Sequence, residues 1–247
     1  MERQSHFFLW FAQGIIYGPT GAGKSKVISG ILEAHQEITT SGLPPTVIYA
    51  YKEVPPEPLK GVALKLHKGL PHIQDLLALR QPDRNLVLIC DDLMDSLTSL
   101  AGAELHDWIS LITEHSRKSN ISILITIQQL FVNSEVIRTL KRNLTFIILF
   151  PFPADESGVL RLLRQICPSR CREVLDGLYI ANTKTKFSAF LFFDLHPHSK
   201  NSAKIRSFVY PRKKKKTNDP LAPAPLYVFH SGPKSWDLSK LQATRNV

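Results

Sequence analysis

The chain has few cysteines and no long apolar run, which argues against a disulfide-rich protein and against a membrane-spanning one. Among its 247 residues are three cysteines, Cys90, Cys167 and Cys171, and this odd, sparse set argues against a disulfide framework. A reducing compartment fits better. No second cluster of metal ligands accompanies Cys167 and Cys171, which argues against a zinc site. No run approaches the roughly 18–20 apolar residues that span a bilayer, so we expect no membrane partner.

Positive charge is unevenly spread along the chain. The net charge is +10 and the isoelectric point is about 9.6, which favours an acidic partner. Residues 211–247 carry +6 of that charge, mostly in Arg212–Lys216, and this leaves +4 for residues 1–210. The folded part is therefore only mildly basic, and net charge alone gives little reason to expect nucleic-acid binding.

The composition changes at residue 211, and we place a domain boundary there. Residues 1–210 are expected to form one domain, whereas residues 211–247, basic and then rich in proline, predict a largely disordered tail. Within that tail, residues 226–229 could dock back onto the domain. The run Pro211–Lys216 has the character of a nuclear import signal, but a solvated charge run or a nonspecific DNA-binding arm has the same composition.

Apolar runs alternate with helical patterns along residues 1–210. Strands are predicted at residues 47–51, 86–90, 121–127, 146–150 and 187–195, and Phe7–Phe11 is interpreted as a lead-in strand rather than a signal-peptide core. Helices are predicted around residues 73–79, 105–112, 136–140 and 159–166, and residues 55–70 are expected to be irregular. This alternation predicts an α/β fold with a mostly parallel central sheet flanked by helices.

A complete phosphate-binding loop follows the first strand of the domain. The pattern G-x-x-x-x-G-K-[ST] is filled by Gly18, Pro19, Thr20, Gly21, Ala22, Gly23, Lys24 and Ser25. Apolar residues 15–17 before it read as a strand, and the apolar spacing after it reads as a helix. We expect the loop amides to wrap nucleotide phosphates, Lys24 to reach the β- and γ-phosphates of ATP, and Ser25 to bind Mg²⁺.

Two acidic residues end the apolar run 86–90 and form the second motif. We assign Asp91 to Mg²⁺ binding and Asp92 to general-base activation of the attacking water. Many ATPases have Glu in the second place, and the alternative is a pair of loop carboxylates that cap the following helix.

Polar residues also follow the apolar strand 121–127. We predict that Gln128 lies between the γ-phosphate and the base and senses hydrolysis, with Gln129 as the competing candidate and a plain strand-end turn as the alternative. An arginine from a neighbouring subunit often completes such sites, and Arg117, Arg138 and Arg142 are candidates, although each taken singly fits a solvated or salt-bridged arginine better.

These motifs together resemble one family. The loop Gly18–Ser25, residues 86–92, Ser116–Phe131 and Leu140–Phe150 look like the genome-packaging ATPases of double-stranded DNA viruses, in the FtsK–HerA branch of P-loop NTPases with a RecA-like fold. The versions in Polinton/Maverick elements and adintovirus-like viruses are the most similar, and adenovirus packaging ATPases are more distant. The resemblance covers roughly residues 12–210.

The chain departs from this family at two places. The family usually has Gln-Asn where this chain has Gln128-Gln129, so the sensor role is carried onto Gln128 alone. It usually has Asn-Pro-Arg-Asp after the Ile-Leu-Phe strand, where this chain has residues 151–155, Pro-Phe-Pro-Ala-Asp. Any function of that arginine is therefore lost or moved here.

The resemblance implies an ATP-driven translocase on double-stranded DNA. It implies a homo-oligomeric ring around the duplex, capsid or vertex proteins as partners, and work in the host nucleus or the virion, with a nuclear import receptor if residues 211–216 act as a signal. Two other classes share the phosphate loop: a small-molecule or nucleoside kinase, and a nucleotide switch that binds DNA without hydrolysis. The residues alone predict Mg²⁺-dependent nucleotide hydrolysis by an α/β domain.

Overall fold

The central sheet orders its strands so that three functional segments end side by side. The computed structural model describes residues 12–33, 45–59, 62–81, 83–168, 171–184, 191–195, 203–206 and 228–230. Its strands are β1 (Gln13–Tyr17), β2 (Thr46–Tyr51), β3 (Leu64–Lys68), β4 (Leu86–Asp91), β5 (Ile121–Ile127), β6 (Phe146–Leu149), β7 (Leu191–Asp194), β8 (Ala203–Arg206) and β9 (Val228–His230). Their order is β3-β2-β4-β5-β1-β6-β7-β8-β9. The first six positions pair in parallel, and β7 to β9 extend the sheet antiparallel.

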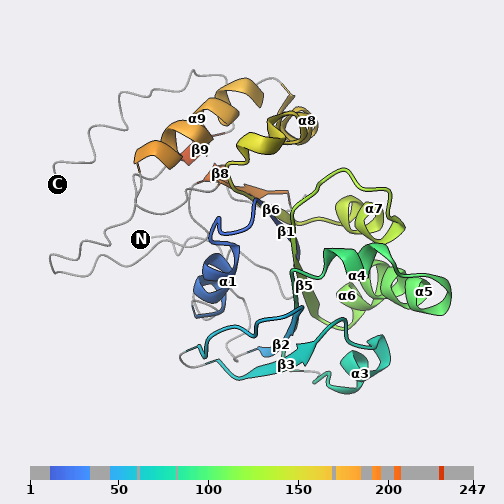
Figure 1. Ribbon diagram of the computed structural model, residues 1–247. Coiled ribbons are helices and arrows are strands. Elements are labelled where there is room, and N and C mark those ends of the chain that lie inside the picture. The colour runs from blue at the N-terminus through green and yellow to red at the C-terminus, as the bar shows by residue number, and fades with distance from the viewer. Residues whose placement is uncertain are drawn as a thin grey trace, which may run out of the picture.

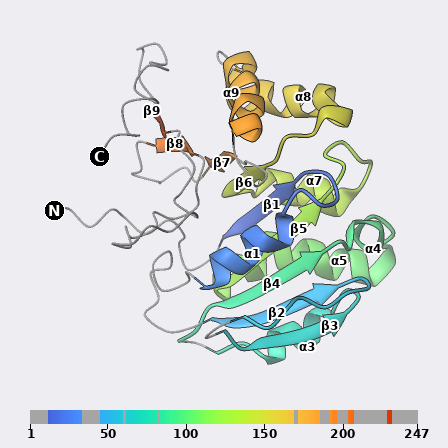
Figure 2. The same cartoon turned by 60° about the vertical axis from the view of Figure 1, so that its left-hand side comes forward.

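Helices cover both faces of this sheet unequally (Figures 1 and 2). Helix α1 (Lys24–Glu33) packs on one face. The opposite face carries the other helices: α3 (Ile73–Ala78), α4 (Met94–Thr98), α5 (Gly102–Ser110), α6 (Ser116–Lys118), α7 (Glu135–Arg142), α8 (Glu156–Ile166) and α9 (Cys171–Lys184). The structure is thus the predicted α/β fold, with a phosphate-binding loop between the first described strand and helix.

Two clusters of buried side chains hold these layers together. Residues alternate between them along each strand, because successive side chains of a strand point to opposite faces. In β4, Leu88 and Cys90 belong to the cluster under α3 to α9, whereas Ile89 belongs to the cluster under α1. Asp91 lies two residues after Ile89, so its side chain lies on the same side of the sheet as α1.

A wide turn of helix interrupts the segment between α5 and α6. Residues 111–115 form a single π-helical turn, η1 (Leu111–His115), and the Ile112 carbonyl at this turn accepts bonds from side chains, one of them from Ser116 Oγ at 2.9 Å. The buried Gln13 side chain in β1 fills that position, since its Nε2 donates to Ile112 O at 2.6 Å and to Ser116 Oγ at 2.7 Å. This contact anchors the helix to β1.

Most predicted elements are found, with one clear error. Residues 55–70 were expected to be irregular, but Leu64–Lys68 forms β3, paired in parallel with β2. The strand lacks the apolar pattern of a buried strand because it lies at the sheet edge, where it carries two exposed lysines and the half-exposed Leu66. Cys167 and Cys171 do not share a helix, since Cys167 follows α8 and Cys171 begins α9.

One stretch of the predicted tail, residues 228–230, belongs to the described part of the chain. Val228–His230 forms β9, which pairs with β8, so part of the segment expected to dock back does join the sheet. The lead-in strand Phe7–Phe11 and the basic run Arg212–Lys216 lie outside the described residues. Within the described part of the chain, no helix has the length and apolar character needed to cross a membrane.

Candidate functional site

The phosphate-binding loop has the backbone that an anion cradle requires. It connects β1 to α1, and Gly21 and Gly23 have φ of 77° and 97°, in the left-handed region that favours glycine. Helix α1 begins at Lys24, so its unpaired first amides and the positive end of its dipole face the loop. The Gly18 amide donates to Ile127 O at 3.3 Å and ties the start of the loop to β5. The loop can therefore hold phosphate oxygens.

Lys24 points into this loop. Its Nζ donates to the carbonyl oxygens of Gly18 at 2.9 Å and Pro19 at 2.8 Å. Partial burial lowers the pKa of Lys24, while the nearby carboxylates of Asp91 and Asp92 act in the opposite direction. The ammonium thus lies between the loop and both acidic residues, where a bound phosphate would offer it a stronger acceptor than the two carbonyls.

Asp91 is held by three hydroxyl groups from three different elements. Its Oδ2 accepts from Ser25 at 2.9 Å and from Tyr49 at 2.6 Å, and its Oδ1 accepts from Thr126 at 2.9 Å. Burial raises the pKa of the Tyr49 phenol, and its contact with Asp91 raises it further. The Asp91 carboxylate is therefore fixed in one orientation beside Ser25.

The donor set around Asp91 fits Mg²⁺. This ion prefers oxygen ligands and is held in proteins by few side chains, with water and nucleotide phosphates completing its shell. Ser25 Oγ and the Asp91 carboxylate are oxygen donors 2.9 Å apart at the end of the phosphate loop. Within the described ranges, no group of three or more His, Cys, Asp or Glu side chains is arranged to hold a metal.

Tyr49 had not been expected in the site, and it gives the first testable prediction. Tyr49→Phe removes one hydroxyl from Asp91 without changing the volume of the buried ring. Loss of a partner that orients a metal ligand typically weakens metal binding by about 10- to 100-fold. We therefore expect the Mg²⁺ concentration for half-maximal ATP hydrolysis to rise by about tenfold. Tyr51→Phe, two residues along β2, is the matched control, since Tyr51 does not bond Asp91. Equal Mg²⁺ titrations for both variants would contradict this role.

Asp92 has a strained backbone and a polar neighbour. Its φ is 57°, which is uncommon for a residue other than glycine and is often found at functional sites. Its amide donates to Thr126 Oγ1 at 2.9 Å, so one threonine of β5 holds both Asp91 and Asp92. Gln128 Nε2 donates to Asp92 Oδ1 at 3.0 Å. The exposed Asp92 carboxylate is thus oriented by Gln128.

The strand order explains why Gln128 reaches Asp92. Strand β5 lies between β1, which leads into the phosphate loop, and β4, which ends in Asp91. The residue after β5 therefore emerges between the loop and the acidic pair. The exposed Gln129 makes no described contact with either carboxylate, and Gln128 is the residue that the geometry joins to them.

The candidate arginines do not gather around this loop. Arg117 lies in α6, just before β5, and so at the opposite end of the parallel strands from the phosphate loop. Arg138 is exposed on α7 and donates to Asn133 Oδ1 at 3.1 Å, and Arg142 lies in the last turn of the same helix. The roles of Arg117 and Arg138 therefore stay predictions.

The end of β1 is also tied to α8. The Tyr17 hydroxyl donates to Asp155, whose other oxygen accepts from the Gly158 amide at 3.0 Å and caps the helix. Burial raises the pKa of Tyr17, and Asp155 adds to the effect. This bond holds the residue just before the phosphate loop, and it makes use of the segment where the chain departs from the packaging-ATPase pattern.

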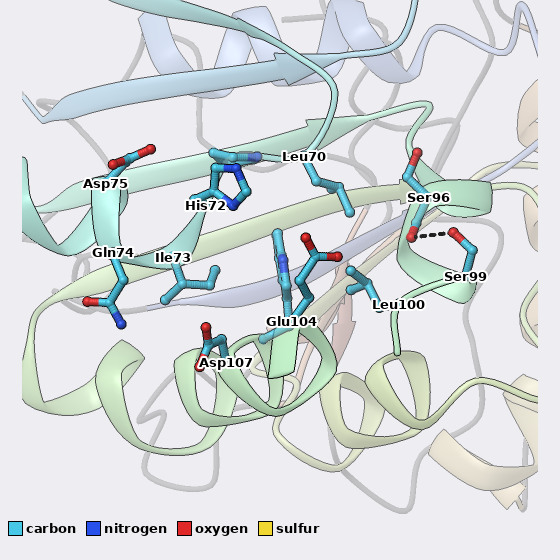
Figure 3. Close-up of a pocket in the computed structure, with 12 residues that line it drawn as sticks. Leu70, His72, Ile73, Gln74, Asp75, Ser96, Ser99, Leu100, Glu104 and Asp107 are labelled. Atoms are coloured by element: carbon cyan, nitrogen blue, oxygen red, sulfur yellow. Dashed lines mark hydrogen bonds between the residues drawn. The ribbon is translucent and has the colours of Figure 1, made fainter. Parts of the chain in front are cut away.

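A pocket of about 550 Å³ lies elsewhere on the protein, between the chain before α3, the α4–α5 connection and α5 (Figure 3). Its walls include Asp75, Glu104 and Asp107 together with His72 and the buried Trp108. None of its lining residues belongs to the phosphate loop or to the pair Asp91–Asp92. Its three carboxylates would repel a phosphate group. Because the pocket lies away from Lys24, it is not placed to hold the molecule that a kinase would phosphorylate.

Comparisons with known proteins give similar solved structures only. No protein-family model and no curated protein matches the chain. It is similar to the genome packaging NTPase B204 from Sulfolobus turreted icosahedral virus 2 in complex with ATP-gammaS, at 13% identity and a TM-score of 0.47, over 77% of this chain and 95% of that chain. It is also similar to EssC (ATPases 2 and 3) from Geobacillus thermodenitrificans, at 14% identity and a TM-score of 0.44, over 61% and 34%. The fold assignment rests on the strand order and loop geometry described above.

Proposed function

We propose that this protein is a Mg²⁺-dependent ATPase. The observation that carries the proposal is the convergence of Ser25, Asp91, Asp92 and Gln128 at one end of the sheet, with Lys24 facing both carboxylates. A structural capping role for the acidic pair would not require a strained Asp92, nor a contact between Asp91 and the loop hydroxyl. The arrangement matches what phosphoryl transfer needs, which is positioned phosphates, charge stabilisation and an activated water.

Each residue has a distinct task in this mechanism. Mg²⁺, when bound, would neutralise phosphate charge, and Ser25 and Asp91 are the residues that would hold it. The loop amides and Lys24 bind the phosphate oxygens and stabilise negative charge as the terminal phosphate leaves. Asp92 accepts the proton of the attacking water, and Gln128, bonded to Asp92 Oδ1, moves with that carboxylate and senses the change.

The work driven by this hydrolysis is assigned from the sequence motifs. The blocks Ser116–Phe131 and Leu140–Phe150, which resemble packaging ATPases, support the assignment of a translocase on double-stranded DNA that packages a viral genome into a preformed capsid. In this proposal a ring of copies surrounds the duplex, a neighbour supplies the arginine, and a capsid or vertex protein anchors the ring. The basic run Arg212–Lys216 supports entry into the host nucleus.

Displacement of a third strand from duplex DNA tests the translocase directly. Purified protein with ATP and Mg²⁺ is expected to release a fluorescent third strand annealed at one end of a long duplex. The nonhydrolysable analogue and the variant Lys24→Ala are expected to release none. Hydrolysis that needs Lys24 but never displaces the strand, with transfer of phosphate to a nucleoside instead, would contradict the proposal and favour a kinase.

A further inference from the structure

An exposed aromatic ring lies against two cations on the α7–α8 side of the protein. Phe131, in the loop that follows β5, is 38% exposed, although most large apolar side chains of the described core are buried. The Arg161 guanidinium on α8 lies 4.2 Å from the ring centroid, and Lys141 Nζ on α7 lies 4.7 Å from it. The three side chains, here named the Phe131 cluster, come from three separate elements that the fold brings together.

The two cations of the cluster have no described counter-ion. The ion pairs of the described residues join other side chains, Lys52–Asp95, Lys118–Glu114 and Arg172–Glu156, and include neither cation. Lys141 Nζ donates instead to the Leu130 carbonyl. Burial lowers the pKa of Lys141, and the charge of Arg161 lowers it further. Two like charges around one ring, without a carboxylate, form a place where an anion is strongly favoured.

The two cations also supply the kind of donors that such an anion needs. The Arg161 guanidinium lies over the Phe131 ring, and the N–H groups of a guanidinium that stacks on an aromatic ring stay available in its plane. Those N–H groups form a planar fork that matches two oxygens of a phosphate. Lys141 keeps two more donors after its bond to Leu130. The exposed Arg138, bonded to Asn133 in the same loop, adds a third cation nearby in the chain.

The cluster is connected to the catalytic site through a short loop. Gln128 at the start of this loop bonds Asp92, and Phe131 is three residues further on. Between them, Leu130 is buried, and Lys141 holds its carbonyl. The loop then continues to α7, on the sheet face that also carries α8 (Figure 1). A shift of Gln128 on hydrolysis would therefore displace the residues of the Phe131 cluster as well.

We propose that the Phe131 cluster binds the phosphodiester backbone of double-stranded DNA. This inference rests on the proposed translocase and names the surface that contacts its substrate. Binding is through phosphates and is independent of base sequence, as a moving motor requires. Because Gln128, at the start of the loop 128–134, bonds Asp92, the same segment links the contact to the nucleotide state.

Salt-dependent duplex binding by a matched pair of variants tests this inference. Arg161→Gln and Arg164→Gln remove the same charge from exposed positions of α8, and only the first belongs to the cluster. Affinity for a fluorescent duplex of mixed sequence is measured by anisotropy over a range of salt, without ATP, on the full chain. Both variants keep Arg212–Lys216, so the contribution of that run cancels in the comparison.

We expect Arg161→Gln to weaken duplex binding by about tenfold and to lower the slope of log affinity against log salt by about one, as the loss of one phosphate contact does. Arg164→Gln should keep the wild-type slope. Arg161→Lys should fall between the two, because it keeps the charge but loses the planar fork of N–H donors.

Equal slopes for Arg161→Gln and Arg164→Gln would overturn the proposal. Weaker nucleotide binding in Arg161→Gln at unchanged duplex affinity would also overturn it, because it assigns Arg161 to a nucleotide phosphate. This binding assay does not depend on ATP hydrolysis. If the protein binds duplex through Arg161 but a separate assay finds no hydrolysis, this inference holds and the proposed ATPase fails.

Discussion

Replacing Lys24 by alanine is expected to lower the rate of ATP hydrolysis by about 100- to 1,000-fold, the usual cost of removing one group that stabilises transition-state charge. Lys24 is the cation that the structure places between the phosphate loop and the two carboxylates. A steady-state assay of phosphate release under saturating ATP measures the effect. Nucleotide affinity should fall as well, because in this mechanism the ammonium would also contact the phosphates of bound ATP before hydrolysis.

A second substitution separates charge from bracing of the loop. The Lys24 ammonium bonds the carbonyls of Gly18 and Pro19, so its loss could act by loosening the loop. Lys24→Gln can still donate to these carbonyls but carries no charge, and we expect it to be as inactive as Lys24→Ala. Lys118→Ala, which removes an exposed lysine at the other end of the strands, should hydrolyse ATP at the wild-type rate. Full activity in Lys24→Gln would contradict the assigned role.

Asp92→Asn is expected to stop turnover while leaving nucleotide binding intact. A general base typically contributes about 100- to 10,000-fold to the rate, and an amide cannot accept the proton of the attacking water. Asparagine suits this position, because it tolerates the left-handed backbone of Asp92 better than alanine does, so the fold should not change. Single-turnover hydrolysis and binding of a fluorescent ATP analogue measure the two quantities separately.

A neighbouring carboxylate provides the control for Asp92→Asn. Asp95 is exposed near the same end of β4 and pairs with Lys52 at 3.0 Å, outside the group around Lys24. Asp95→Asn makes the same chemical change and should leave the rate within about twofold, since exposed ion pairs contribute little. If Asp92→Asn retains its rate while Asp95→Asn loses it, the base has been assigned to the wrong carboxylate.

The sequence is sufficient to locate the loop and the acidic pair, because each motif is continuous along the chain. Strand β4 is apolar up to Cys90, and β5 is apolar apart from Ser122 and Thr126, as is typical of strands buried on both faces. The functional residues follow directly at the ends of these runs. The Gly18–Ser25 pattern likewise needs no tertiary information. Gln128 is predicted for the same reason, and its bond to Asp92 distinguishes it from the competing candidate Gln129.

The parts that could not be predicted depend on strand order. Tyr49 and Thr126 lie inside apolar strands, where a hydroxyl has no visible partner until β2 and β5 are placed on either side of β4. Thr126 is one of two polar residues in the apolar strand β5, and this is a weak signal of function. The Phe131 cluster joins residues up to thirty positions apart on three elements, and Phe131 alone reads as an ordinary core residue.

Steady-state ATP hydrolysis by the purified protein, with and without long double-stranded DNA, tests the central claim most directly. The structure and motifs predict turnover that needs Mg²⁺ and Lys24 and that rises several-fold when duplex is added. Turnover that is indifferent to duplex would contradict a DNA translocase and favour a small-molecule kinase. Intact nucleotide binding without any turnover, in Mg²⁺ and duplex, would contradict the ATPase and favour a nucleotide switch.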